Sequence, residues 1–92
     1  MALLSDSEIE QKLGGLAGWE RAGDAIRKSF KRDGFVGSVR FVSSLVEPAE
    51  GMNHHPDVSV SWDTVTVTIS THSEGGLTTA DFELAEKIDA LA

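Results

Sequence analysis

Two of the three histidines in this chain stand side by side in Asn53-His54-His55-Pro56, just before an alternating apolar run. Imidazole titrates near neutral pH and can give or take a proton without a cofactor, and it is also a common metal ligand. Successive residues of an extended chain point to opposite faces, so His54 and His55 are not expected to share one ion. The pair therefore favours proton transfer over metal binding, with polar residues in a turn as the third alternative.

Three more polar residues could join the pair. Glu50 lies four residues before His54, so the two share a face if a helix extends that far. His72 follows the last strand pattern, and Asp81 lies in the first turn of the last predicted helix. Asp81 also completes a capping box, Thr78-x-x-Asp81, which alone would explain its presence. A zinc ion would have to recruit one of these residues, and the chain has neither cysteine nor an H-E-x-x-H motif.

Capping signals and periodicity predict the elements that position these residues. The first helix should start at a Ser5-x-x-Glu8 capping box and reach about Leu13. Two strands are expected next, over residues 18–21 and 25–31, followed by a helix over 35–46. Two further strands over 58–62 and 65–69 and a helix over 78–91 complete the chain. Pro48 should kink the second helix or end it near Glu47, with one further turn toward Met52. The order α-β-β-α-β-β-α predicts an α+β fold, with a four-stranded antiparallel sheet and helices packed on one face.

Apolar residues at helical or strand spacing indicate the predicted core. The two later helices carry apolar stripes, formed by Phe35, Val39, Val42 and Val46, with Phe41 and Leu45 beside them, and by Phe82, Ala85, Ile88 and Leu91. Val58, Val60 and Trp62 share one parity, which predicts a half-buried strand. That parity favours a core position for Trp62, and the alternative is the wall of a pocket for a flat ligand. Trp19 is also predicted to lie in the core.

Length and composition limit the classes of protein that this chain can be. Ninety-two residues predict one domain, residues 1–92, whose thin core often gains stability by oligomerising. The formal net charge is -7, and Lys87 is the only lysine or arginine after Arg40, so the chain lacks the basic footprint of a nucleic-acid-binding protein. It shows neither a signal peptide nor an apolar run long enough to span a membrane. We therefore expect a cytoplasmic protein with no nucleic-acid or membrane partner.

Several of these residues together resemble a known signature. Glu50-Gly-Met-Asn-His54-His55-Pro56, then Trp62, Ser70-Thr-His72, Gly76-Leu77-Thr78 and Asp81 resemble the pterin-4a-carbinolamine dehydratase family, the 4a-hydroxytetrahydrobiopterin dehydratases. Gly18-Trp19, Asp24-Ala25-Ile26 and Phe30 are similar to the first hairpin of that family. The resemblance spans roughly residues 5–91. It implies the same α-β-β-α-β-β-α order that the residues themselves predict.

The resemblance also implies an activity and roles for residues. The implied activity is that of a hydro-lyase, which dehydrates 4a-hydroxytetrahydropterin to quinonoid dihydropterin and so recycles tetrahydrobiopterin. The resemblance further implies that the reaction needs no metal or other cofactor and that the protein is a homodimer or homotetramer. It implies three catalytic histidines, His54, His55 and His72, with Glu50 orienting His54 and Asp81 orienting His72. His55, His72 and Trp62 are expected to bind the pterin. The alternative is a non-catalytic binding or assembly module that serves a protein partner or dimerisation.

Overall fold

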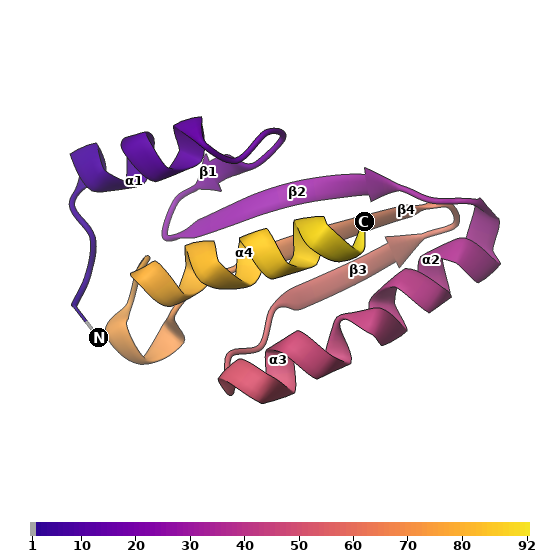
Figure 1. Cartoon of the computed structure of the whole chain (residues 1–92). Coiled ribbons are helices and arrows are strands. Elements are labelled where there is room, and N and C mark those ends of the chain that lie inside the picture. The colour runs from indigo at the N-terminus through magenta and orange to yellow at the C-terminus, as the bar shows by residue number, and fades with distance from the viewer. Residues whose placement is uncertain (1) are drawn as a thin grey trace.

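An antiparallel sheet with helices on one face makes up residues 2–92, the part of the chain that this computed structural model describes. The strand order is β1-β2-β4-β3. The elements follow the chain as α1 (Asp6–Gly14), β1 (Glu20–Ala22), β2 (Ala25–Lys31), α2 (Gly34–Ser44), α3 (Val46–Met52), β3 (Asp57–Ser61), β4 (Thr64–Ile69), the short 3-10 helix η1 (His72–Glu74) and α4 (Thr79–Leu91). Figure 1 shows α4 lying across the sheet and α2 and α3 running beside β3. The predicted α+β fold is confirmed.

Helix ends lie close to the positions that the capping patterns predict. The backbone N–H of Glu8 donates to Ser5 Oγ at 3.2 Å, and the backbone N–H of Ser5 donates to Glu8 Oε1 at 2.9 Å, so both halves of the first capping box form. The predicted middle helix is two helices, because α2 ends at Ser44 and α3 begins at Val46. Pro48 is the third residue of α3, where a backbone N–H would have no partner inside the helix, so the proline costs no hydrogen bond.

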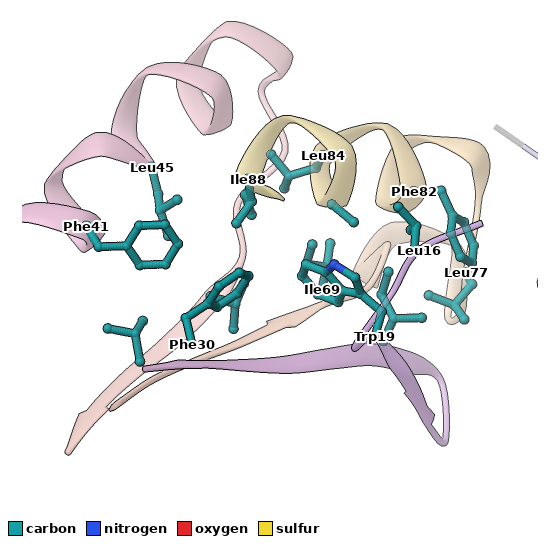
Figure 2. Close-up of a cluster of buried hydrophobic side chains, with 14 of the residues drawn as sticks. Leu16, Trp19, Phe30, Phe41, Leu45, Ile69, Leu77, Phe82, Leu84 and Ile88 are labelled. Carbon is teal, nitrogen blue, oxygen red and sulfur yellow. The ribbon is translucent and has the colours of Figure 1, made fainter. Parts of the chain in front are cut away.

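The core lies between the sheet and the helices. β4 is one of the two inner strands, between β2 and β3, and its side chains at Val65, Val67 and Ile69 are fully buried. Figure 2 shows Phe30 of β2 between Phe41 of α2 and Ile88 of α4. Trp19 is buried as predicted, and its indole Nε1–H donates to both carboxylate oxygens of Asp89 on α4. This core holds the start of α4 against the end of β4, which is where the polar residues of interest meet.

The edge strand β3 is more exposed than its alternating pattern predicts. Val58 and Val60 pair with Val67 and Val65 across the sheet, so they face the helices, yet they are 37% and 39% exposed. The prediction that Trp62 belongs to the core is wrong, because its side chain is 69% exposed. Alternation indicates which residues share a face of the sheet. It does not indicate whether another layer covers that face at the sheet's edge.

Trp62 lies in the turn between β3 and β4 with an uncommon backbone conformation. Its φ is 51°, in the left-handed region that bulky residues rarely adopt. The hydroxyl of Ser38, itself fully buried, donates to the carbonyl oxygen of Trp62 at 2.7 Å. On the other side of the turn a hydrogen bond from Lys31 lowers the pKa of the Asp63 carboxyl, whose oxygen lies 3.0 Å from Lys31 Nζ. These contacts fix the turn while leaving the indole in solvent.

Candidate active site

The end of α3 determines where the two histidines point. Asn53 adopts the left-handed conformation with φ 50° and ψ 45°, which asparagine tolerates better than most residues. The backbone N–H groups of Asn53 and His54 donate to carbonyls of the last helical turn, at Glu50 and Ala49. The chain therefore leaves the helix abruptly, and His54 no longer continues the helical face that carries Glu50.

His54 faces α4 and meets a buried carboxylate there. Its Nε2 lies 2.6 Å from Oδ1 of Asp81, and its side chain is 14% exposed. Asp81 is fully buried in the first turn of α4. A buried carboxylate is costly unless it is paired and hydrogen-bonded, so this contact is a strong constraint on the imidazole.

The second oxygen of Asp81 is held by two threonines. Oδ2 accepts a hydrogen bond from the hydroxyl of Thr71 at 2.9 Å and another from the backbone N–H of Thr78 at 2.8 Å. The hydroxyls of Thr71 and Thr78 also lie 2.9 Å apart, within the same buried cluster. Asp81 thus caps α4, as its spacing predicts, and binds His54 with its other oxygen.

Thr71 is a site residue outside the predicted set, although the sequence carries a signal for it. Val65, Val67 and Ile69 alternate along the buried face of β4, and Thr71 continues that parity. A polar residue in register with a buried row needs a buried partner. Asp81 supplies that partner, so the alternation of β4 could have located both residues.

The pairing of carboxylates with histidines differs from the one predicted. Glu50 contacts His55 rather than His54, through a hydrogen bond between Glu50 Oε2 and His55 Nε2. Both of these side chains are more than half exposed. The i, i+4 spacing of Glu50 and His54 has no effect because α3 ends at Met52, before the fourth residue is reached.

His72 lies apart from the buried pair. Asp81 does not orient it, and its nearest acidic partner is Asp57, with 3.9 Å between His72 Nε2 and Asp57 Oδ2 and both side chains 76% exposed. Trp62 is farther away, because it lies at the opposite end of β3, about 17 Å along the strand. Within one chain, therefore, the structure does not bring Trp62 to the histidines.

The two adjacent histidines line different cavities. His54 lines a polar cavity of about 380 Å³ between the end of α3, the η1 loop and α4, whose wall consists of Met52, Asn53, His54, Thr71, Ser73, Glu74, Ala80 and Glu83. His55 lines an apolar groove of about 220 Å³ between α2, α3 and β3, together with Val42, Leu45, Val46, Ala49, Glu50, Pro56 and Val58. Among residues 2–92, His54 and His55 therefore line separate cavities. His54 is the histidine with a buried partner and a polar cavity.

Residues 2–92 contain no group of three or more His, Asp and Glu side chains placed to hold a metal ion. None of their helices has the length and apolar character needed to cross a membrane.

Comparison with solved structures gives the fold class of this chain. Its structure superposes on a transcriptional coactivator/pterin dehydratase from Brucella melitensis with a TM-score of 0.94 and 35% identity, covering 99% of both chains. A pterin dehydratase-like protein described as a RuBisCO assembly factor in the alpha-carboxysome shares the fold, with a TM-score of 0.70 and 23% identity over 82% of this chain and 89% of its own. The fold is thus that of the pterin dehydratases.

The family follows from the sequence comparisons. Residues 2–91 match the family model described as Pterin 4 alpha carbinolamine dehydratase. A relative from Roseiflexus castenholzii, named "Putative pterin-4-alpha-carbinolamine dehydratase", is 48% identical over 98% of this chain and 97% of its own length. A relative of the same name from Mycobacteroides abscessus is 48% identical over 97% of this chain and 95% of its own. The chain belongs to the pterin-4a-carbinolamine dehydratase family.

Proposed function

We propose that this protein is a hydro-lyase that dehydrates 4a-hydroxytetrahydropterin to quinonoid dihydropterin, with His54 as the principal acid–base group. In this reaction the C4a–O bond breaks, the electron pair of the N5–H bond becomes the C4a=N5 double bond, and the hydroxyl leaves as water. One proton must leave N5 and one must reach the departing oxygen. An imidazole can carry out both transfers near neutral pH. The product would re-enter the tetrahydrobiopterin cycle after reduction.

The observation that carries this proposal is the hydrogen bond between His54 and the buried carboxylate of Asp81. A carboxylate that is fully buried and aimed at one imidazole nitrogen fixes the orientation of the ring. The ring lies in the wall of a polar cavity, so it can meet a small molecule there. A histidine held by a buried carboxylate in the wall of a cavity is a candidate general acid–base group.

The wall of the cavity also suits the proposed substrate. The pterin ring carries an amino group and ring N–H groups along one edge, and carboxylates accept hydrogen bonds from such donors. Glu74 and Glu83 both line the cavity around His54. We propose that these carboxylates bind the donor edge of the pterin. His55 and His72 remain proposed pterin-binding and secondary acid–base residues, and their exposure leaves them accessible to substrate.

The test is the rate at which the purified protein dehydrates synthetic 4a-hydroxytetrahydropterin, followed by absorbance. We expect a clear acceleration over buffer, since positioned acid–base groups typically contribute about 10²–10⁴-fold. Free imidazole at the concentration of the protein's histidines is the matched control, because it supplies the same group without the site. A rate equal to that of free imidazole would contradict the enzymatic function.

A second candidate function, a binding or assembly module, has its own supporting observation. Large apolar side chains gather on α2, α3 and the β3 hairpin and are 37–69% exposed; they are Phe35, Val36, Val39, Val46, Val58, Val60 and Trp62. Among residues 2–92, the outer edge of β3 also has no strand beside it. Open edges and large apolar patches mark association surfaces. We propose that a second copy of the chain covers this face, giving a homodimer or homotetramer, whether or not the protein is also an enzyme.

Sedimentation velocity of two matched variants tests this association. Val39 on α2 and Leu91 on α4 are both 45% exposed, but only Val39 belongs to the apolar face. Val39→Lys is expected to shift the protein toward the monomer, because the interface would have to bury an unpaired ammonium group. Leu91→Lys should sediment like the wild type. A wild-type chain that sediments as a monomer would overturn the proposal.

A further inference from the structure

The contacts of His54 differ between its two ring nitrogens. Nε2 faces the buried oxygen Oδ1 of Asp81, whereas Nδ1 makes no hydrogen bond with the described residues. No buried side-chain nitrogen or oxygen of residues 2–92 lacks a partner. Nδ1 is therefore not completely buried, in keeping with the 14% exposure of the His54 side chain. Because His54 lines the polar cavity, Nδ1 is the nitrogen that a bound molecule can reach.

We infer that Nδ1 of His54 is the nitrogen that exchanges protons with the substrate, and that Thr71 is a positioning residue that fixes it through Asp81. This inference rests on the proposed function for the identity of the substrate. It goes further in assigning the transfer to one atom. It also adds Thr71, which acts through Asp81 without touching the reacting atoms.

The number of protons that Asp81, Thr71 and Thr78 can each donate determines the direction of the hydrogen bonds among them. A carboxylate only accepts, so the hydroxyl proton of Thr71 goes to Oδ2 of Asp81. Thr71 has a single hydroxyl proton, and its contact with the Thr78 hydroxyl must therefore be donated by Thr78. Thr78 is fully buried and Thr71 is 7% exposed, so the protein itself supplies most of the surroundings of both hydroxyls. The carboxylate is held at Oδ2 and its other oxygen is aimed at the imidazole.

This arrangement selects one form of the neutral imidazole. With Oδ1 accepting, the proton of neutral His54 lies on Nε2 and the lone pair lies on Nδ1. Nδ1 can then take the proton from N5 of the pterin and return it to the departing hydroxyl, so no proton is gained or lost over a turnover. Nε2 keeps its proton and its hydrogen bond to Asp81 throughout.

Heteronuclear NMR of the imidazole nitrogens tests the assignment without any substrate. Above the titration range of histidine we expect His54 to be almost entirely the Nε2–H form. The exposed His72 serves as the reference, and His54→Gln identifies the His54 signals. A neutral His54 with its proton on Nδ1 would overturn the inference. This measurement is independent of turnover, so it stands even if the dehydration assay shows no activity and the proposed function fails.

Two variants test the role of Thr71. Thr71→Val keeps the shape but removes the donor to Asp81, and we expect a fall in kcat of about tenfold and loss of the single tautomer at His54. Thr71→Ser keeps the hydroxyl and should retain kcat within about twofold and the wild-type His54 signals. Unchanged His54 signals in Thr71→Val would contradict the positioning role. If Thr71→Val does not fold, loss of the single His54 tautomer in the folded Thr71→Ser variant would contradict the positioning role, because the hydroxyl is still present.

Discussion

Substitution of His54 by glutamine is expected to lower kcat for dehydration by about 10²–10⁴-fold, which is the usual contribution of a positioned acid–base group. Glutamine can place an amide N–H near the position of Nε2, so Oδ1 of Asp81 keeps a donor. The variant removes only the titratable nitrogen that faces the cavity. His54→Ala would be a less informative change, because a buried carboxylate left without its partner costs about 3–5 kcal/mol.

The same substitution at His72 provides the comparison. His72 is 76% exposed and has no buried partner, so His72→Gln should lose less kcat than His54→Gln. Steady-state rates of the two variants show which histidine contributes more to kcat. Thermal unfolding curves verify that both variants are folded. Full activity in His54→Gln would show that another group carries the proton transfer.

Asp81→Asn should lower kcat by a similar factor of about 10²–10⁴ while retaining the fold. The amide oxygen would accept from Thr71 and from the backbone N–H of Thr78, as Oδ2 of Asp81 does now. The amide NH₂ would then point at Nε2 of His54, which would have to become the acceptor. Neutral His54 would carry its proton on Nδ1 and could no longer accept one there. In a serine protease triad the corresponding Asp-to-Asn change, a worked case of this tautomer effect, costs about 10⁴ in kcat.

The fold itself should lose about 1–3 kcal/mol in Asp81→Asn, the cost of a weakened buried hydrogen bond. Asp89→Asn is a suitable control on the same helix, because Asp89 binds Trp19 and Lys28 and lies outside the cavity of His54. It should lose stability while kcat stays near the wild-type value. Rates and chemical denaturation of both variants separate the two effects. Equal activity in Asp81→Asn and Asp89→Asn would contradict the role given to Asp81.

Local signals in the sequence were sufficient for most of the fold. The capping boxes at Ser5 and Thr78 act over three residues, and the alternation of β4 reflects a strand buried between two neighbours. The exposure of Trp62 was not predictable in this way. It depends on the position of β3 at the edge of the sheet, and strand order is a property of the whole topology.

The candidate site was predictable in its members but not in its pairing. His54 and Asp81 both belong to the predicted set, yet they are 27 residues apart, so no helical or strand spacing relates them. Their contact requires the left-handed turn at Asn53, which ends α3 one residue before His54. Spacing rules assume that an element continues, and here the functional residue lies where the element stops.

The double use of Asp81 has a consequence for the range of sequences that this position accepts. As the third residue of a capped helix it could be replaced by several residues that accept a hydrogen bond from the N-cap backbone, glutamate foremost. As the partner of His54 it must also have the length of aspartate, a negative charge and a second oxygen that can accept from the imidazole. Natural or designed variants must satisfy both requirements at once, so few residues other than aspartate are acceptable at position 81. Sequences optimised for folding alone would drift at this position, and drift here would remove the chemistry without a visible change in the fold.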